Sequence, residues 1–250
     1  VVEFPVTPSS QYGIIFRKQE LNPQNINSAV QVVYQVTDRD VSTRVSAELL
    51  SLLWEQPFYE SLRTKQQLGY IVYSGIKSID GVLNLSFVVQ SSVVDVDDIS
   101  MRIQSFLDSF EGVLKTQIKE NDVNSVKEGL INKKLEPDKR LDQEASRNWE
   151  EIVLELYRYN RKLKEAEILR KIKKSDLIAF FEIYIKRDPN LKNGKESKRR
   201  LVTSQSISQN NPNVNASLKT LEELKQSPQI ADAVIEKDEF TFKKDLTILP

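Results

Sequence analysis

The chain has 250 residues, and its 36 Lys and Arg residues balance 36 Asp and Glu residues, so the formal net charge is zero. This balance provides no general attraction to nucleic acid or to an anionic membrane surface. The sequence contains no Cys and no His, which excludes disulfides, thiolate metal sites, the commonest zinc ligand and a Ser-His-Asp relay.

Apolar and polar residues alternate in the first part of the chain, as they do in β-strands. The pattern predicts strands over about residues 12–17 and 29–36. The apolar residues then recur at helical spacing, and Asp40 or Ser42 is expected to cap the N-terminus of that helix. Pro57 is expected to break the helix, because proline lacks the backbone N–H that a helix interior needs.

A second short helix is predicted over residues 58–68, followed by a β-hairpin. Gly69 is expected to end this helix, and the next strand is expected to begin at Tyr70 and run to residue 76. The pair Asp80-Gly81 favours the positive φ of a two-residue hairpin turn. The partner strand is predicted over residues 82–90.

The second half of the chain is predicted to be mainly helical. Helices are expected over residues 99–114, 121–135, 140–158 and 175–186. The first carries an amphipathic stripe that includes Phe106 and Phe110, and it is expected to pack on the sheet. The element order predicts an α+β fold, with a mainly antiparallel sheet and helices packed on one face.

The composition becomes basic and then polar across residues 186–217. We interpret this stretch as a mobile surface segment within one domain that spans residues 1–250. An edge strand over residues 201–203 is expected to interrupt it, and residues 204–217 are expected to form a polar loop.

The predicted junction between residues 58–68 and the following strand carries two candidate binding residues. Arg63 presents a planar set of donors that suits peptide carbonyls or carboxylates. Tyr70 presents a phenol that can donate to a developing oxyanion. Structural roles remain open for both, because Arg63 can pair with Glu60 or Gln67 on the helix surface and Tyr70 can be a core residue.

The same segment carries a family resemblance. Residues 62–72 read LRTKQQLGYIV, which resembles the LRTKEQLGYIV stretch of the insulysins, the insulin-degrading branch of the pitrilysin-like zinc peptidases. The single difference is Gln66 in place of Glu. Weaker similarity covers nearly the whole chain, and it suggests the fourth and last homologous domain of such an enzyme. Its segments are residues 34–38, 87–91, 134–135, 138–139, 148–149, 151–152 and 240–250.

The resemblance implies a division of labour between two halves of one polypeptide. In insulysins, the N-terminal half binds zinc on an H-x-x-E-H helix, and the C-terminal half contributes an Arg and a Tyr that hold substrate; these match Arg63 and Tyr70. A family aromatic on the prime side of the scissile bond, usually Phe, matches Tyr59. The implied partners are short flexible peptides and the N-terminal half, and a homodimer of the parent remains open.

The absence of His means that this chain carries no zinc motif, so it is expected to be inactive alone, with zinc in the N-terminal half of its parent. The alternative is a catalytically dead scaffold or protein-interaction domain of the same fold.

No membrane span is expected, because no segment approaches the ~20 apolar residues required. The acidic run at Asp95, Asp97 and Asp98 is interpreted as a helix start. A cytoplasmic location is expected, because Cys and a signal-peptide pattern are both missing.

Overall fold

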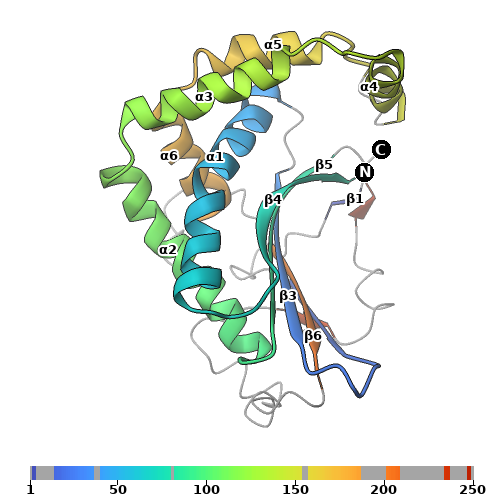
Figure 1. Cartoon of the computed structure of the whole chain (residues 1–250), viewed down its shortest axis with the longest axis vertical. Helices are drawn as coiled ribbons and strands as arrows, with labels where there is room; N and C mark the ends of the chain where they lie inside the picture. The colour runs from blue at the N-terminus through green and yellow to red at the C-terminus, as the bar shows by residue number, and fades with distance from the viewer. Residues whose placement is uncertain are drawn as a thin grey trace.

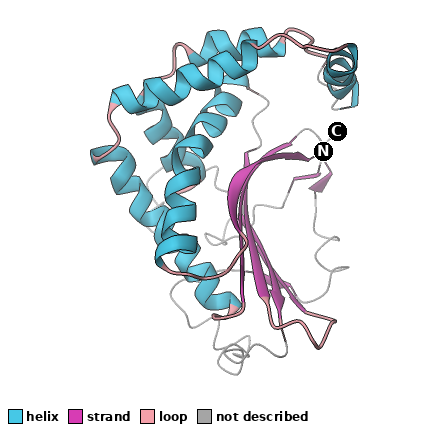
Figure 2. Ribbon diagram, in the orientation of Figure 1, coloured by secondary structure: helices cyan, strands magenta, loops and turns pink. Residues whose placement is uncertain are grey.

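The computed structural model describes residues 2–3, 14–36, 40–79, 82–153, 157–186, 201–208, 234–236 and 247–248. Within them, a six-stranded mixed sheet has strand order β4-β5-β3-β6-β2-β7 and carries helices on one face (Figures 1 and 2). The strands are β2 (Ile14–Gln19), β3 (Ser28–Val36), β4 (Val72–Ile79), β5 (Val82–Ser91), β6 (Leu201–Ile207) and β7 (Val234–Glu236). Two short strands, β1 (Val2–Glu3) and β8 (Thr247–Ile248), pair separately.

The helical layer covers the side of the sheet that lies to the left in Figure 1, and α4 projects beyond the sheet at the top. Its helices are α1 (Val41–Tyr59), α2 (Val96–Thr116), α3 (Glu120–Leu135), α4 (Leu141–Val153), α5 (Arg161–Leu169) and α6 (Lys174–Tyr184), and α1 continues into a π-helical turn, η1 (Glu60–Lys65). Among these helices, none combines the length and apolar character that crossing a membrane requires.

The α+β architecture with a mainly antiparallel sheet is confirmed. Strand β3 pairs antiparallel with β5 and β6, and β4 pairs antiparallel with β5. The period-2 pattern of β3 corresponds to its burial, since Val30, Val32, Tyr34 and Val36 are all buried. Strand β2 adds a parallel element, because it pairs parallel with β6 and β7.

The hairpin joins β4 to β5 in a register that places Ile79 opposite Val82. The predicted turn pair Asp80-Gly81 lies outside the described residues. Strand β4 begins at Val72 rather than at Tyr70. Tyr70 therefore belongs to the connection that precedes the strand.

The segment after residue 200 corrects one prediction. Strand β6 extends to Ile207 and lies between β3 and β2, so it is an interior strand rather than an edge strand, and residues 204–207 belong to it rather than to the predicted loop. The part of that loop beyond Ser208 lies outside the described residues. Its polar residue Gln205 is buried, and its side chain accepts from Arg17 Nε at 2.6 Å and donates to Ser100 Oγ at 2.9 Å. Hydrogen bonds from distant segments make this polar strand suitable for the sheet interior.

The predicted break at Pro57 is also wrong. Pro57 lies inside α1, and the helix passes through it into η1. The backbone N–H of Glu60 bonds to the carbonyls of Gln56 and Pro57, so hydrogen bonding resumes after the missing donor. Asp40 caps the start of α1 as predicted, because its side chain accepts from Thr43 N at 3.1 Å.

The helix expected over residues 140–158 is shorter than predicted. Helix α4 ends at Val153, and Tyr157 has a positive φ of 51° that no helix interior tolerates. The structure adds α5, a separate helix that was not predicted. It packs beside α1 and α3.

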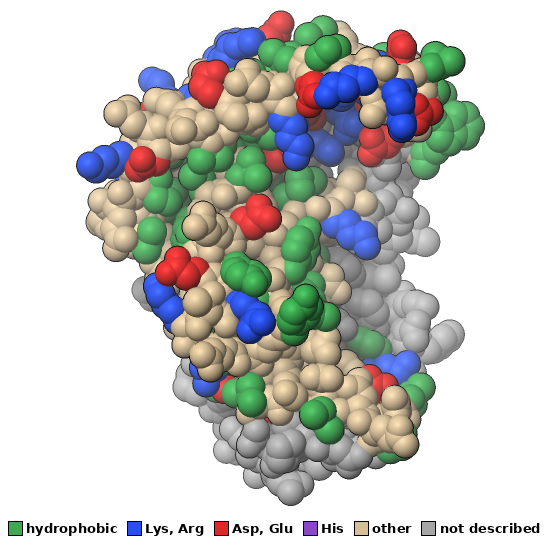
Figure 3. Space-filling model, viewed as in Figure 1, with side chains coloured by type: hydrophobic (Ala, Val, Ile, Leu, Met, Phe, Trp, Pro, Cys, Tyr) green, Lys and Arg blue, Asp and Glu red, His purple; other side chains and the backbone are tan. Residues whose placement is uncertain are grey.

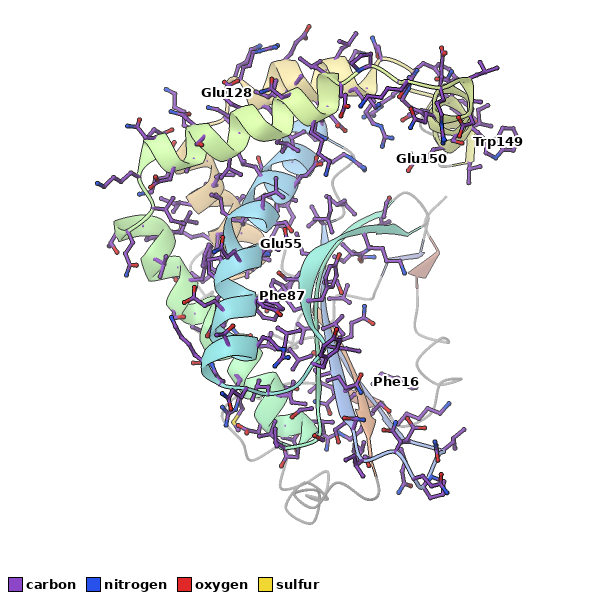
Figure 4. The ribbon with its side chains drawn as sticks, in the orientation of Figure 1. Phe16, Glu55, Phe87, Glu128, Trp149 and Glu150 are labelled. Atoms are coloured by element: carbon purple, nitrogen blue, oxygen red, sulfur yellow. The ribbon has the colours of Figure 1, made fainter. Side chains whose placement is uncertain are left out.

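An aromatic cluster joins the helices to the sheet. Phe87 of β5 (Figure 4) lies 5.1 Å from Trp54 and 5.2 Å from Phe58, both on α1, between ring centroids. The predicted stripe of α2 completes the cluster: Phe106 contacts Phe58 at 5.1 Å, and Phe110 contacts Trp54 at 6.0 Å. All five rings are buried, as expected for the α2 stripe.

Replacing Phe110 with Ala is expected to lower the free energy of unfolding by about 3–5 kcal/mol, because the change leaves a cavity against Trp54. Met101 on the same helix is 42% exposed, so Met101→Ala is expected to stay within about 0.5 kcal/mol of the parent chain. Urea denaturation monitored by Trp fluorescence measures both. Equal effects of the two changes would contradict this packing.

Gly69 lies where the chain crosses closely over β5. A Cβ added there would overlap the carbonyl oxygen of Gln90 and lie 3.0 Å from its carbonyl carbon. Both are backbone atoms, so they cannot move aside as a flexible side chain would. Gly69 is therefore required by close backbone approach.

Gly69→Ala is expected to destabilise the fold by about 1–3 kcal/mol, because the backbone must shift. Gly112 is the matched control, since nothing lies within 4 Å of a Cβ added to it in α2. Gly112→Ala is expected to stabilise the chain by about 0.5–1 kcal/mol through helix propensity. Thermal melts of the two variants should therefore shift in opposite directions, and a shared direction would contradict the close approach.

Candidate functional site

The site begins at the end of α1, where the helix widens into η1. The backbone N–H of Gln66 bonds to Ser61 O at 3.1 Å, which is the i→i+5 spacing of a π-helix. Gln67 then takes a positive φ of 52°, and Leu68 N bonds to Leu62 O at 3.1 Å. These bonds end the helix and turn the chain toward the sheet, much as a left-handed C-cap does.

Buried anchors hold this turn on both sides. Leu62 and Leu68 are buried in the core. Gln66, the residue that departs from the family pattern, accepts from Arg102 of α2 at 2.9 Å and donates to Ser61 Oγ at 3.3 Å. Beyond Gly69, Ile71 O accepts from Gln90 N at 2.9 Å. The turn between η1 and β4 is thus fixed to α2 and β5.

Arg63 and Tyr70 come together on this turn. The Cζ atom of Arg63 lies 5.6 Å from the centroid of the Tyr70 ring, which is within the range of a cation–π contact. The Nε atom of Arg63 is buried and has no hydrogen-bond partner among the residues that the structure describes. Tyr70 is 86% exposed. The pair therefore places a guanidinium beside an exposed phenol, and both carry donors.

The two structural alternatives for these residues do not hold. Glu60 pairs with Lys65 at 3.2 Å instead of with Arg63, and the described residues provide no ion pair for Arg63. Tyr70 is exposed instead of being a core residue. Within the described part of the chain, the one polar or ring contact of each side chain is with the other.

Tyr59, the third predicted residue, lines a groove between α1 and β4 that neither Arg63 nor Tyr70 lines. We call it the α1–β4 groove; it consists of two adjoining cavities of about 480 and 530 Å³ that share Leu52, Glu55, Tyr73 and Ser74. Tyr59 lines the smaller cavity, and Gly129 and Lys133 of α3 line the larger one. Figure 3 shows exposed apolar side chains in green over this part of the molecule.

The sequence analysis singled out Tyr59 but missed the rest of the groove. Glu48, Leu52, Glu55 and Tyr59 recur at spacings of four, three and four residues, which places them on one stripe of α1. This mixture of acidic and aromatic residues on a partly exposed stripe was a usable signal. The opposite wall, on β4, could not be deduced from local pattern.

The acidic run before α2 is a helix start, as interpreted. Asp95 caps α2 by accepting from Asp98 N at 2.7 Å, and Asp97 forms an ion pair with Arg17. Within the described ranges, no group of His, Cys, Asp or Glu side chains is arranged to hold a metal ion. The chain supplies no imidazole or thiolate, so its donor set does not fit zinc.

Comparison with known proteins relates the sequence and the fold of this chain to a family. Residues 49–149 match the family model described as PQQ synthase PqqF-like, C-terminal lobe domain 4. Nardilysin from Pongo abelii is 32% identical across the whole chain, which spans 22% of that protein. Insulin-degrading enzyme-like 1, peroxisomal, from Arabidopsis thaliana is 36% identical over 66% of the chain, which spans 17% of it.

Solved structures share the fold at lower identity. Pitrilysin superposes on the whole chain with a TM-score of 0.71 and 18% identity, and the match spans 24% of that protein. A Pseudomonas fluorescens protein described as a peptidase M16 inactive domain matches 78% of the chain and 43% of its own length, with a TM-score of 0.54 and 11% identity. The chain spans about a fifth of the curated relatives it matches. Together, the family model, the relatives that align along the chain and the shared fold identify it as a C-terminal domain of the M16 peptidases.

Proposed function

We propose that the chain is the substrate-binding, non-catalytic part of a zinc metalloendopeptidase, and that Arg63 and Tyr70 hold a peptide beside a metal centre on another part of the same polypeptide. The observation that carries the proposal is the contact between these two side chains, at 5.6 Å from Cζ to ring centroid, on a turn fixed to the core. Their donors face no competing partner among the described residues.

Tyr70 suits the stabilisation of charge that develops during peptide-bond cleavage. A phenol can donate a hydrogen bond to a carbonyl oxygen as that oxygen becomes anionic. The guanidinium of Arg63, held over the Tyr70 ring at 5.6 Å from Cζ to the centroid, favours one orientation of the phenol and places charged donors beside it. Arg63 would thereby anchor a peptide carbonyl next to the reacting bond.

The metal must come from outside this chain. Zinc supplies Lewis-acid chemistry when it is bound, but the absence of His and Cys leaves only oxygen ligands here. The relatives named nardilysin and insulin-degrading enzyme-like 1 are about five times longer than their matched segments, so a longer parent has room for a metal-binding half. The role of this domain is to position the substrate.

A scaffold role is the second candidate. One structural relative with this fold is described as an inactive domain of an M16 peptidase, so the fold alone does not imply participation in hydrolysis. The two roles differ in what they require of Arg63 and Tyr70. A scaffold needs neither donor, whereas a substrate-binding domain needs both.

In the full-length parent, Tyr70→Phe is expected to lower kcat by about 10²-fold to 10³-fold, because it removes one oxyanion donor. The thermal stability should hardly change, since the Tyr70 side chain is 86% exposed. Arg63→Ala is expected to lower kcat/KM, and Arg63→Lys should restore little, because an ammonium cannot replace the planar donor set. Steady-state cleavage of a quenched-fluorescent peptide, with melts alongside, measures these effects.

Glu60→Ala is the control for this experiment. Glu60 is on the same turn but pairs with Lys65, so its loss should leave kcat and KM near the parent values. Near-normal activity of both Tyr70→Phe and Arg63→Ala would overturn the substrate-binding role and favour the scaffold.

The purified 250-residue chain is expected to bind no zinc tightly and to hydrolyse no peptide alone. Carboxylate and carbonyl oxygens are a poor match to the usual ligands of zinc. Metal analysis by mass spectrometry after dialysis against zinc measures the first point. One zinc ion retained per chain would contradict it.

A further inference from the structure

The α1–β4 groove runs along the open edge of the sheet. Among the described strands, β4 has a neighbour on one side only, because it is the first strand in the sheet order. Successive residues of a strand alternate between its two faces, so Tyr73 and Gly75 lie on one face of β4 and Val72, Ser74 and Ile76 on the other. Residues from both faces line the groove. A groove that contacts both faces follows the edge of the strand, where unpaired backbone groups lie.

The groove contains an acidic side chain that no described residue neutralises. Glu55, labelled in Figure 4 on α1 beside β4, lines both cavities and forms no ion pair with the described residues. By contrast, Glu48 at the far end pairs with Lys134 at 2.6 Å. The half-exposed rings of Tyr59 and Tyr73 line the same cavity as Glu55. A carboxylate with two aromatic rings suits a Lys or Arg side chain.

The groove also contains a buried polar group that no described residue satisfies. Ser74 is only 3% exposed and lines both cavities, and its Oγ atom has no hydrogen-bond partner in the described part of the chain. A buried hydroxyl in this state destabilises the fold. A ligand that donates to Ser74 or accepts from it would remove that cost.

We propose that the α1–β4 groove binds an extended peptide of about five residues as an additional strand on β4, with a basic side chain of the peptide beside Glu55. Residues 72–76 line the groove, which at roughly 3.3 Å per residue matches a strand of this length. The main chain supplies affinity through hydrogen bonds to the edge, and the pocket at Glu55 supplies selectivity. The inference extends the proposed function by specifying a substrate class, but the binding step does not use Arg63 or Tyr70.

The charge pairing is tested by direct binding to the 250-residue chain. The probe is a fluorescein-labelled peptide of about six residues with one central Lys, and fluorescence anisotropy measures its Kd. Glu55→Gln is expected to weaken binding about threefold to fivefold, the range for a solvent-accessible ion pair. With norleucine in place of Lys in the peptide, the same variant should change nothing.

Glu128 provides the matched control. It is an exposed carboxylate on α3 (Figure 4) that lines neither cavity, so Glu128→Gln should leave the Kd unchanged for both peptides. The proposal is overturned if Glu55→Gln leaves the Lys peptide unaffected. It is equally overturned if both Glu variants weaken binding to the same extent, because that outcome indicates general charge attraction.

Ser74→Ala tests peptide binding at the edge of β4 through two measurements, the melting temperature and the Kd of the peptide. Removing an unpartnered buried hydroxyl should raise the melting temperature or leave it unchanged, whereas loss of a hydrogen bond to the peptide should weaken binding about threefold to tenfold. N-methylation of the central peptide bonds should weaken binding at least as much, because it removes main-chain donors. Unchanged binding by the N-methylated peptide would exclude strand addition.

The same variants separate this inference from the proposed function. Loss of turnover in Tyr70→Phe and Arg63→Ala, together with an unchanged Kd in Glu55→Gln, would leave the substrate-binding role standing and refute the groove. Normal turnover in Tyr70→Phe and Arg63→Ala, together with weaker binding of the Lys peptide by Glu55→Gln, would support the groove and refute the substrate-binding role of Arg63 and Tyr70.

Discussion

The contact of Phe87 with Trp54 and Phe58 fixes the position of α1 on the sheet, and the site depends on that position. The ring centroid of Phe87 lies 5.1 Å from that of Trp54 and 5.2 Å from that of Phe58, across the interface between β5 and α1. Phe106 and Phe110 of α2 extend the cluster, so the two longest helices share one aromatic core. Aromatic pairs contribute both buried area and preferred geometry. Because Phe58 directly precedes Tyr59, the cluster also determines where the last turn of α1 meets β4.

The backbone after Phe58 converts this fixed helix end into an outward-facing site. The π-helical spacing of η1 changes the direction in which Arg63 leaves the helix, compared with a continued α-helix. The positive φ of Gln67 and the close approach of Gly69 to Gln90 then bring the chain back to the sheet. A loop with these constraints has little freedom to move, which suits residues that must hold a substrate in one orientation.

The elements that the sequence predicts well are those whose evidence is local. Period-2 alternation identified β3, and the stripe of α2 identified its buried face, since both patterns follow from burial on one side of a regular element. Strand β6 was misjudged because its suitability for the interior depends on two hydrogen bonds of Gln205 with residues far away in the sequence: it accepts from Arg17 and donates to Ser100. The break at Pro57 failed for a related reason: buried Phe58 and Leu62 continue the packing of the helix beyond the proline.

The candidate site also has a part that local sequence patterns predict and a part that depends on the tertiary fold. The motif at residues 62–72 indicated Arg63 and Tyr70, and their contact requires only a short connection between helix and strand. The pocket around Glu55 requires α1 and β4 to lie side by side, a tertiary relationship that no local pattern contains. Sequence therefore indicates a residue pair, whereas the fold is needed to recognise a groove.

Two of the buried polar atoms that lack a hydrogen-bond partner among the described residues lie close to this edge of the molecule, whereas others, such as Trp54 Nε1 of α1 and Arg161 Nη1 of α5, lie elsewhere. The Nε atom of Arg63 and the Oγ atom of Ser74 are buried without hydrogen bonds, and Glu55 has no ion pair among the described residues. By contrast, the buried Gln205 is fully engaged by neighbours on both sides. Native folds satisfy nearly all buried polar groups, so each exception needs an explanation, and at Arg63 and Ser74 a bound ligand would supply one. The same edge carries the exposed rings of Tyr59 and Tyr73. A bound strand would satisfy the unpaired backbone of β4 and these side chains together, so the stability lost in the free domain is recovered in the complex.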